Sequence, residues 1–320
     1  MVDLTPILTA ARQAAALCQE VQQRHIVRSD KAGHEPVTIA DYGSQAIICR
    51  TLKAHYPDDG VMAEESGTQF MELVAPEQRA YIVELVGQIL GVTVTEEDMV
   101  NWLDHGSGIE TPRLWVIDPI DGTKGFLGQR HYVNAIGIMQ DRRPVGGVIA
   151  APAYPGGGRL FHAIDGVAYT ESLIESNDRR QIQVTDQTEP QSLRGLESIE
   201  KSHAGLERLA RARALMGMTE SLTEQADSME KYCRIAAGDA EVYMRLPRIG
   251  STRPHSIWDH APGVAILEAA GGQATDVDGS PLDFSIGRTL QNYGVIATNG
   301  HVHDSAVASV QTLLKEEEAE

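Results

Sequence analysis

A chain of 320 residues can bury a large core, and its length suits two domains or one large one. Hydrophobic residues make up 42% and charged residues 22%, which is ordinary for a globular protein, and no run of about 18 uncharged apolar residues could span a bilayer. A formal net charge of −18 excludes a general nucleic-acid binder, but not a protein that binds a small phosphorylated substrate through a divalent cation.

The first part of the chain is expected to be helical. Apolar residues recur at helical spacing from about residue 6 to residue 24, in a segment that lacks the basic start and apolar core of a secretory signal. A second helix is expected after Asp41, ending at the turn of residues 56–60, and a third over residues 81–90.

The cysteines indicate a reducing compartment. They are widely separated and lie in apolar, helix-like surroundings: Cys18, Cys49 and Cys233. Neither a disulfide framework nor a zinc cluster has this spacing. Buried thiols are therefore expected, and together with the absence of a secretory signal they predict a cytoplasmic protein.

The middle of the chain is expected to form strands. Residues 114–117 are a short apolar run that predicts a buried strand ending at Asp118. Two hairpins are predicted after it, over residues 132–150 and 160–169, because alternating or apolar runs flank short turns there.

Helices and strands alternate from about residue 180, which is typical of an α/β protein. The expected helices are 205–216, 228–237, 260–270 and 303–315, and the expected strands are 241–246 and 294–298. A domain boundary is expected near the glycine-rich residues 155–158. Residues 1–157 would form an α+β N-terminal domain, and residues 158–320 an α/β C-terminal domain.

Acidic residues close or interrupt apolar segments at four places: Asp41, Glu64 with Glu65, Asp118 with Asp121, and Asp259. A helix cap explains Asp259 taken alone, and a solvated loop explains Glu64. The Asp-Pro-Ile-Asp-Gly-Thr motif at 118–123 is different, because a purely structural turn needs neither both carboxylates nor the apolar residue between them.

The 118–123 motif supplies what a hard divalent cation binds. Its two carboxylates are oxygen ligands on one short segment, and the backbone carbonyl of Ile120 could add another. The N–H groups of Gly122 and Thr123 could bind a phosphate oxygen at a helix start. The motif therefore favours metal-assisted phosphate chemistry.

This motif, with Trp-Asp-His-Ala-Pro-Gly at 258–263, resembles the paired signature of the inositol monophosphatase superfamily of lithium-sensitive phosphatases. The resemblance covers nearly the whole chain, because residues 36–41 and 64–66 stand where that family has its other acidic positions. Gly-Phe at 125–126 and the insertion between the second and third acidic sites resemble the 3'(2'),5'-bisphosphate nucleotidases within it. The resemblance implies an α/β, layered αβαβα, sugar-phosphatase-like fold with a cleft between its halves.

The resemblance also implies a set of metal ligands for two or three Mg²⁺ ions. Glu64, Asp118 and the carbonyl of Ile120 would hold one ion, and Asp118, Asp121 and Asp259 a second. The chemistry implied is hydrolysis by a metal-activated water, without a covalent intermediate.

Asp41 and Thr123 have the remaining catalytic roles that the resemblance implies. Asp41 would act as the base, through the hydroxyl of Thr123, on the attacking water. No Gly-x-Ser-x-Gly elbow or reactive cysteine offers a competing nucleophile.

A further block indicates the substrate. By resemblance to the nucleotidases, the contacts to 3'-phosphoadenosine 5'-phosphate are His203, Ser228, Lys231 and Arg245, with Gly122 and Thr123 at the reacting phosphate. Taken alone, Lys231 and Arg245 are only surface cations and His203 only a histidine at a helix start. Residues 202–205 are less serine-rich than the nucleotidase pattern.

The sequence thus predicts a Mg-dependent nucleotidase that converts 3'-phosphoadenosine 5'-phosphate to AMP and phosphate. Its partner would be a small phosphorylated nucleotide, with no nucleic-acid polymer and no membrane. One alternative is an inositol polyphosphate or fructose bisphosphate phosphatase of the same superfamily. An inactive metabolite-binding protein is the alternative from another class, although every expected acid is present.

Overall fold

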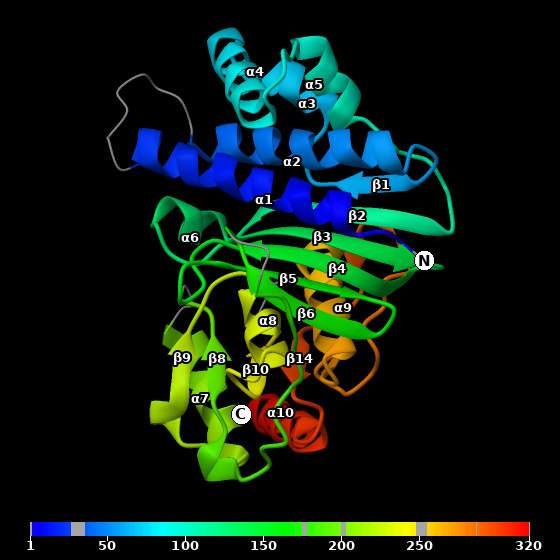
Figure 1. Ribbon diagram of the computed structural model, residues 1–320. Coiled ribbons are helices and arrows are strands. Elements are labelled where there is room, and N and C mark those ends of the chain that lie inside the picture. The colour runs from blue at the N-terminus through cyan, green and yellow to red at the C-terminus, as the bar shows by residue number, and fades with distance from the viewer. Residues whose placement is uncertain are drawn as a thin grey trace.

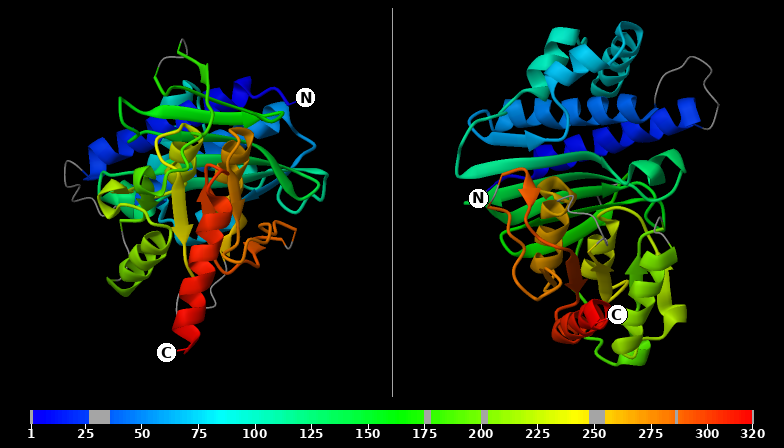
Figure 2. Two further views of the ribbon diagram at one scale, coloured as in Figure 1. Left: turned by 90° about the horizontal axis from the view of Figure 1, so that it is seen from below. Right: turned by 180° about the vertical axis from the view of Figure 1, so that it is seen from behind.

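The structure is a computed structural model that describes residues 2–26, 36–174, 178–199, 203–247, 255–285 and 287–319. Its elements stack as alternating helix, sheet, helix, sheet and helix layers (Figure 1). The view from behind shows the same order of layers (Figure 2, right). The predicted layered α/β fold is confirmed.

The first helical layer is the pair α1 (Thr5–Val21) and α2 (Pro36–His55), and α1 continues as a π-helical turn (Gln22–Ile26). Small residues let the pair approach closely, because a Cβ added to Gly43 of α2 would lie 2.8 Å from Leu17 Cδ1 of α1. The prediction that the second helix begins after Asp41 was wrong. The described part of α2 already includes residues 36–41, so Asp41 lies within the helix and not before it.

Three shorter helices cover the outer side of α2: α3 (Gly67–Leu73), α4 (Pro76–Leu90) and α5 (Glu96–Leu103) (Figure 1). The helix expected over 81–90 is the C-terminal two thirds of α4. The sequence analysis missed α3 and α5, although α5 carries a signal. Thr95 and Asp98 form a reciprocal capping box at its start.

In the described residues, the larger sheet has seven strands in chain order: β1 (Gly60–Ala63), β2 (Arg113–Asp121), β3 (Val133–Gln140), β4 (Arg143–Ala151), β5 (Arg159–Ile164), β6 (Val167–Ser172) and β7 (Arg180–Gln181). Strands β1 and β2 are parallel, and the pairs from β2–β3 to β6–β7 are antiparallel. Both predicted hairpins are confirmed, as β3–β4 and β5–β6. Pairing crosses the expected domain boundary, since Ala151 pairs with Arg159. The division at residue 157 stays a prediction, and it would separate two paired strands.

Two helices fill the layer between the sheets: α8 (Glu230–Ala236) and α9 (Ala261–Ala269) (Figure 1). Residues 261–267 of α9 are buried, as expected for an apolar helix enclosed by other elements. Glycines in the sheet allow its close approach. A Cβ added to Gly147 of β4 would lie 2.8 Å from the carbonyl oxygen of Pro262.

The smaller sheet has the order β12-β14-β10-β8-β9: β8 (Gly195–Glu197), β9 (Thr223–Gln225), β10 (Val242–Arg245), β12 (Gln273–Thr275) and β14 (Val295–Thr298). Helices α7 (His203–Leu215) and α10 (His303–Ala319) cover its outer face (Figures 1 and 2). A short ribbon, β11 (His255–Ser256) with β13 (Thr289–Leu290), leads into the 3-10 helix η4 (Ile257–Asp259). The expected helices and strands of this half are confirmed.

Two further predictions concern the burial of the cysteines and the presence of membrane-spanning helices. Cys18, Cys49 and Cys233 are buried free thiols, as predicted, and burial raises the pKa of Cys18 and Cys49 to about 12. In the described part of the chain, no helix combines the length and the apolar character that crossing a membrane requires.

Candidate active site

Asp118 and Asp121 lie on strand β2, at an irregularity in its pairing with β3. Asp118 pairs with Ala135 and Asp121 with Val133, so Pro119 and Ile120 together stand opposite the single residue Asn134, and β2 has one residue more than β3 here. The prediction of a turn after the strand was wrong, because the strand resumes at Asp121 and the motif is a β-bulge. Proline has no N–H for the ladder and fits such a bulge.

The bulge is held against the helical layer through the Pro119 carbonyl. That oxygen accepts hydrogen bonds from Asn134 Nδ2 at 2.5 Å and from Ser44 Oγ at 3.4 Å. Ser44 is on α2, one turn beyond Asp41. The side chain of Ile120 is buried among the helices, which fixes the peptide between the two aspartates.

Glu64 reaches the same edge of the sheet from β1. Because β1 is parallel to β2 with Ala63 opposite Ile117, the residue after Ala63 lies beside Asp118. Gln45 of α2 fixes the following residue: its Nε2 donates to the Glu65 carbonyl at 2.8 Å, and its Oε1 accepts from the Glu65 N–H at 2.9 Å.

Asp259 comes from the C-terminal half, as the last residue of η4. The N-cap position of α9 is His260, whose side chain makes no capping hydrogen bond, so Asp259 lies one residue before the cap position. His260 is buried, and its Nδ1 lies 2.8 Å from the hydroxyl of Tyr232 on α8. Asp259 is thereby held between the ribbon and the middle helical layer.

The pKa values show that these carboxylates act on one another. Burial raises the pKa of Asp118 well above its usual range, and the charges of Asp121, Glu64, Asp259 and Asp41 raise it further. Asp118 is 3% exposed, so water screens little of this repulsion. The predicted acids are therefore one cluster, although they come from α2, the end of β1, β2 and η4.

Two more acids of the cluster have raised pKa values. Burial raises the pKa of Asp41 well above its usual range, and the charges of Glu64 and Glu65 add to it. For Glu64, burial comes first, then the charges of Glu65, Asp259 and Asp121, and its pKa rises to about 7 although Arg288 opposes the shift. Glu64 keeps an exposed surface, so solvent weakens its repulsion more than that of Asp118.

The cluster suits a hard divalent cation by its chemistry. Its donors are carboxylate oxygens, and the Oδ1 atom of Asp118 is buried with no hydrogen-bond partner. Yet no three His, Cys, Asp or Glu side chains of the described residues are arranged so that they could hold a metal ion as they stand. Binding a cation there would therefore require these side chains to move closer together.

The pH dependence of stability follows from these pKa values. We expect the metal-free protein to melt at lower temperature as the pH rises from about 4.5 to about 7. Glu64 has a pKa of 4.5 when unfolded and about 7 when folded, so its ionisation costs more in the folded state over this window. The raised pKa of Asp118 also makes the folded state less stable as the pH rises.

Scanning fluorimetry in chelator, at steps across this window, measures the effect. Glu64→Gln should flatten the slope, and saturating Mg²⁺ should remove most of it for the wild type. A melting temperature that rises equally in wild type and Glu64→Gln would contradict the prediction.

Cations lie near Asp121. Its pKa is raised by burial, but Lys231, the Met229 N–H and Arg245 oppose the shift. Lys231 is only 4% exposed, its Nζ donates to the Ala226 carbonyl at 3.1 Å, and it lies 5.1 Å from the centre of the Tyr243 ring. It is therefore not a surface cation, as its residue type alone had indicated.

Gly122, Thr123 and Ser228 lie next to the bulge. Gly122 has a φ of +91° and precedes α6 (Thr123–Leu127), and a Cβ added to it would lie 3.1 Å from Ser228 Cβ. Gly125 has no room for a side chain, because an added Cβ would lie 2.0 Å from the His131 carbonyl oxygen. Thr123 is exposed, and in the described structure no hydrogen bond joins it to Asp41.

The structure brings together Asp41, Glu64, Asp118, Asp121 and Asp259, with Lys231 and Arg245 beside Asp121. His203 is the first residue of α7, and its side chain lies outside the described part. The sequence analysis missed Gln45, Arg288 and Tyr232. None of them belongs to a motif, and only the fold places them beside the acids.

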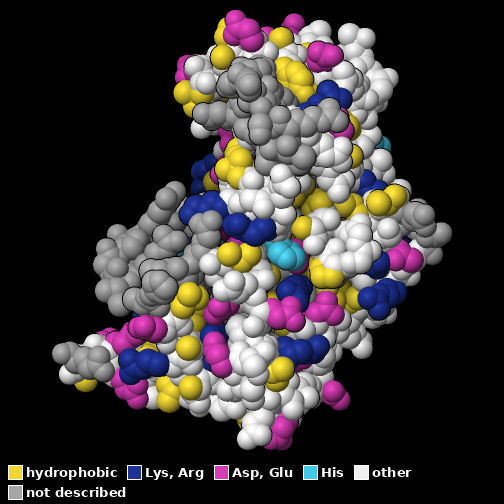
Figure 3. Space-filling view, turned by 90° about the vertical axis from the view of Figure 1, so that its left-hand side faces the viewer, with side chains coloured by type: hydrophobic (Ala, Val, Ile, Leu, Met, Phe, Trp, Pro, Cys, Tyr) yellow, Lys and Arg dark blue, Asp and Glu magenta, His cyan; other side chains and the backbone are white. Residues whose placement is uncertain are grey.

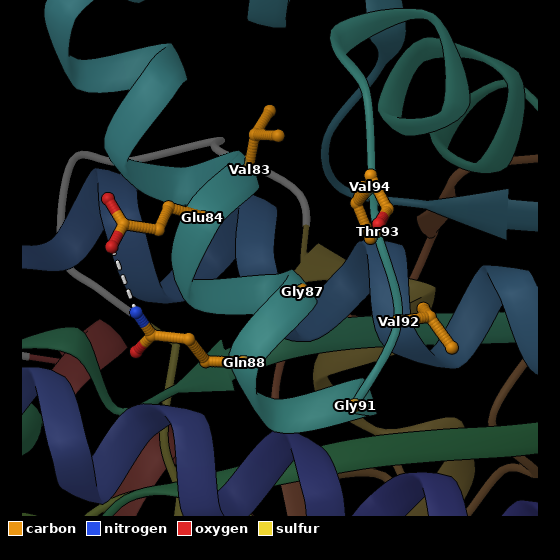
Figure 4. Close-up of a pocket in the computed structure, with 8 residues that line it drawn as sticks. All are labelled: Val83, Glu84, Gly87, Gln88, Gly91, Val92, Thr93 and Val94. Atoms are coloured by element: carbon orange, nitrogen blue, oxygen red, sulfur yellow. Dashed lines mark hydrogen bonds between the residues drawn. The ribbon is translucent and has the colours of Figure 1, made fainter.

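The face of the molecule that carries α6 is shown in Figure 3. Lys, Arg and His side chains gather near its middle, and Asp and Glu side chains lie below them. A separate hollow lies on the outer helices, between the end of α4 and the chain that follows (Figure 4). It is lined by Val83, Glu84, Gly87, Gln88 and residues 91–94. A lone glutamate there, hydrogen-bonded to Gln88 at 2.9 Å, offers none of the chemistry of the carboxylate cluster.

The fold and the carboxylate cluster define a layered α/β protein of the phosphatase type. The chain belongs to the inositol monophosphatase family, whose sequence profile matches residues 3–315. A 3'(2'),5'-bisphosphate nucleotidase of Oryza sativa is 34% identical over 350 residues, covering 98% of this chain and 95% of the relative. The 3'(2'),5'-bisphosphate nucleotidase 1 of Candida albicans is 31% identical over 346 residues, covering 97% and 95%.

Solved structures show the same fold. An inositol monophosphatase from Anabaena matches with a TM-score of 0.60 at 22% identity, over 97% of both chains. An IMPase of Thermotoga maritima matches with a TM-score of 0.65 at 19% identity, again over 97% of both chains. The predicted resemblance to this family and to its nucleotidases is confirmed, and the family is generally metal-dependent.

Proposed function

We propose that this protein is a magnesium-dependent 3'(2'),5'-bisphosphate nucleotidase that hydrolyses 3'-phosphoadenosine 5'-phosphate to AMP and phosphate. The observation that carries the proposal is the cluster of mutually repelling carboxylates around the buried Asp118, with Lys231 and Arg245 on its far side. The names of the relatives support a phosphorylated nucleotide as substrate. The proposed partner is that small molecule in the cytoplasm, and neither a nucleic-acid polymer nor a membrane.

The carboxylates have the role of metal ligands in this proposal. Glu64, Asp118 and the carbonyl of Ile120 would hold one Mg²⁺. Asp118, Asp121 and Asp259 would hold a second, and the proposed number of ions is two or three. Bound Mg²⁺ neutralises the phosphoryl oxygens and lowers the pKa of the attacking water. The raised pKa values support this assignment, because a cation removes the repulsion that raises them.

Asp41 and Thr123 handle the proton and the phosphate. Asp41 would accept the proton of the attacking water through the Thr123 hydroxyl, and its position in the second turn of α2 puts it within the field of Glu64 and Asp118. The N–H groups of Gly122 and Thr123, at the start of α6, would donate to a phosphoryl oxygen.

The cationic side would bind the rest of the substrate. Arg245 is half-buried at the end of β10, and Lys231 and Ser228 lie at the start of α8. A bisphosphate nucleotide has a second phosphate for these groups, whereas an inositol monophosphate has none. His203 stays a proposed contact.

A phosphate-release assay in Mg²⁺ and in excess chelator tests the proposed chemistry. We expect activity to require Mg²⁺, because the ligands are all hard oxygen donors. Lithium should inhibit at concentrations at which sodium does not. Full activity in chelator would rule out the metal mechanism.

Arg245→Ala should raise the KM for 3'-phosphoadenosine 5'-phosphate about tenfold or more and spare a simple monophosphate. A charge-assisted contact to phosphate contributes roughly 1.5–3 kcal/mol, and each 1.4 kcal/mol is about tenfold. Lys231→Ala should act in the same direction, with an added loss of stability because the side chain is buried.

Steady-state kinetics on both substrates separate the two effects. Arg211→Ala is the matched control, because Arg211 of α7 forms an ion pair with Glu316 of α10. Equal losses on both substrates would show that Arg245 supports the fold instead.

A further inference from the structure

Glu64 lies between two neighbours whose backbones are each held by a side chain from elsewhere in the chain. On one side, the Glu65 carbonyl accepts a hydrogen bond from Gln45 Nε2 at 2.8 Å, and the Glu65 N–H donates to Gln45 Oε1 at 2.9 Å. On the other, Arg288 Nη2 donates to the Ala63 carbonyl at 2.9 Å. Gln45 is fully buried on α2, so its amide has no water to exchange with.

Arg288 holds the C-terminal half of the cluster as well. Its guanidinium carbon lies 4.5 Å from the centre of the Trp258 ring, and Trp258 immediately precedes Asp259. Its backbone carbonyl accepts a hydrogen bond from the Ile257 N–H at 3.0 Å. One residue therefore joins the end of β1 to η4, the two segments that carry Glu64 and Asp259.

The proposed site needs Glu64 and Asp259 within one cluster, and the contacts of Arg288 link the two segments that carry them. The two residues are about 195 positions apart in sequence, on different layers of the fold. Glu64 is exposed and follows a short strand, so its own packing does not fix its carboxylate. Groups that orient a ligand contribute to metal affinity without touching the metal.

We propose that Gln45 and Arg288 are positioning residues that hold Glu64, and through Trp258 also Asp259, ready to bind a divalent cation. The inference rests on the proposed function, because it assumes that these two carboxylates are metal ligands. Through its hydrogen bonds with Glu65, Gln45 links the end of β1 to α2, the helix that carries Asp41. Through the Ala63 carbonyl and Trp258, Arg288 links the end of β1 to η4, which carries Asp259. Neither residue takes part in the chemical step.

Direct binding of Mn²⁺ to the protein without substrate, followed by electron paramagnetic resonance, tests this proposal. Gln45→Met and Arg288→Met keep the length of each side chain and remove its hydrogen bonds. Each should weaken Mn²⁺ binding by about tenfold, the low end of what such supporting residues contribute. Arg288→Lys should recover much of the loss, since an ammonium group can still donate to the Ala63 carbonyl.

Matched controls separate positioning from general stability. Gln311→Met removes a Gln-to-carbonyl hydrogen bond of 2.9 Å on α10, and Arg142→Met removes an Arg-to-carbonyl bond of 2.5 Å to Ser285. Both controls should bind Mn²⁺ like the wild type. At saturating Mg²⁺, Gln45→Met and Arg288→Met should also keep the wild-type KM for substrate.

The possible results separate a failure of the positioning inference from a failure of the proposed function. Wild-type Mn²⁺ affinity in folded Arg288→Met and Gln45→Met would overturn the inference and leave the proposed function intact. Should Gln45→Met not fold, the exposed Arg288 decides alone. A wild-type protein that binds no Mn²⁺ would overturn the proposed function, and the inference with it.

Discussion

Asp118→Asn is expected to reduce phosphate release by at least about a thousandfold while the protein stays folded. A metal ion contributes several kcal/mol to the transition state, and each 1.4 kcal/mol is about tenfold in rate. Asp118 is the acid on which the charges of Asp121, Glu64, Asp259 and Asp41 all act, so it stands at the centre of the cluster. Removing its charge removes a ligand of both proposed ions.

The same substitution should not destabilise the metal-free protein. The Asp118 carboxylate is buried, and repulsion raises its pKa, so a neutral amide relieves a cost that the folded state bears. Thermal melting in chelator and phosphate release in Mg²⁺ are the two measurements. Asp165→Asn in the exposed β5–β6 turn is the control and should change neither. Near wild-type turnover in Asp118→Asn would remove Asp118 from the metal site.

Asp41→Asn is expected to lower kcat by about 10²–10⁴-fold and to change KM little, because a general base acts in the transition state. Its carboxylate lies close to Glu64 and Asp118 but is bonded to neither, which suits a group that moves a proton beside the metal ligands. The pH profile of kcat should lose its acidic limb. A kcat close to wild type would show that Asp41 is not the base.

A double substitution tests the route through Thr123. If the Thr123 hydroxyl passes the proton to Asp41, then Asp41→Asn combined with Thr123→Ala should cost little more than the larger single loss. Thr123→Ser, which keeps the hydroxyl, should retain most of the activity. Independent, additive losses would place the two residues in separate roles.

The sequence predicted the acids better than the backbone that carries them. Paired carboxylates around a proline have few structural explanations, so the motif at 118–123 indicates a site, but its sequence predicts a turn where the structure has a β-bulge. Residue spacing alone cannot show that Asp121 resumes pairing with β3. The start of α2 was misplaced for a similar reason, since residues 36–40 suit an extended segment until tertiary packing favours the helix.

Residues that support the acids could not be found from the sequence. Gln45 and Arg288 match no motif, and their partners, Glu65 and Ala63, are 20 and 225 residues away. The burial of Lys231 was equally hidden, because a lysine in a polar stretch usually covers the surface. These features depend on how the layers meet, which local patterns do not encode.

Phosphate release from a small panel of substrates in Mg²⁺ distinguishes the nucleotidase from the other phosphatases of its family. We predict that 3'-phosphoadenosine 5'-phosphate is cleaved to AMP and phosphate far faster than inositol 1-phosphate or fructose 1,6-bisphosphate, with loss of the 3' signal in ³¹P NMR. A preference for an inositol phosphate or for fructose bisphosphate would contradict the nucleotidase assignment and keep the phosphatase chemistry. Release from none of them, by a folded protein that binds Mn²⁺, would contradict both.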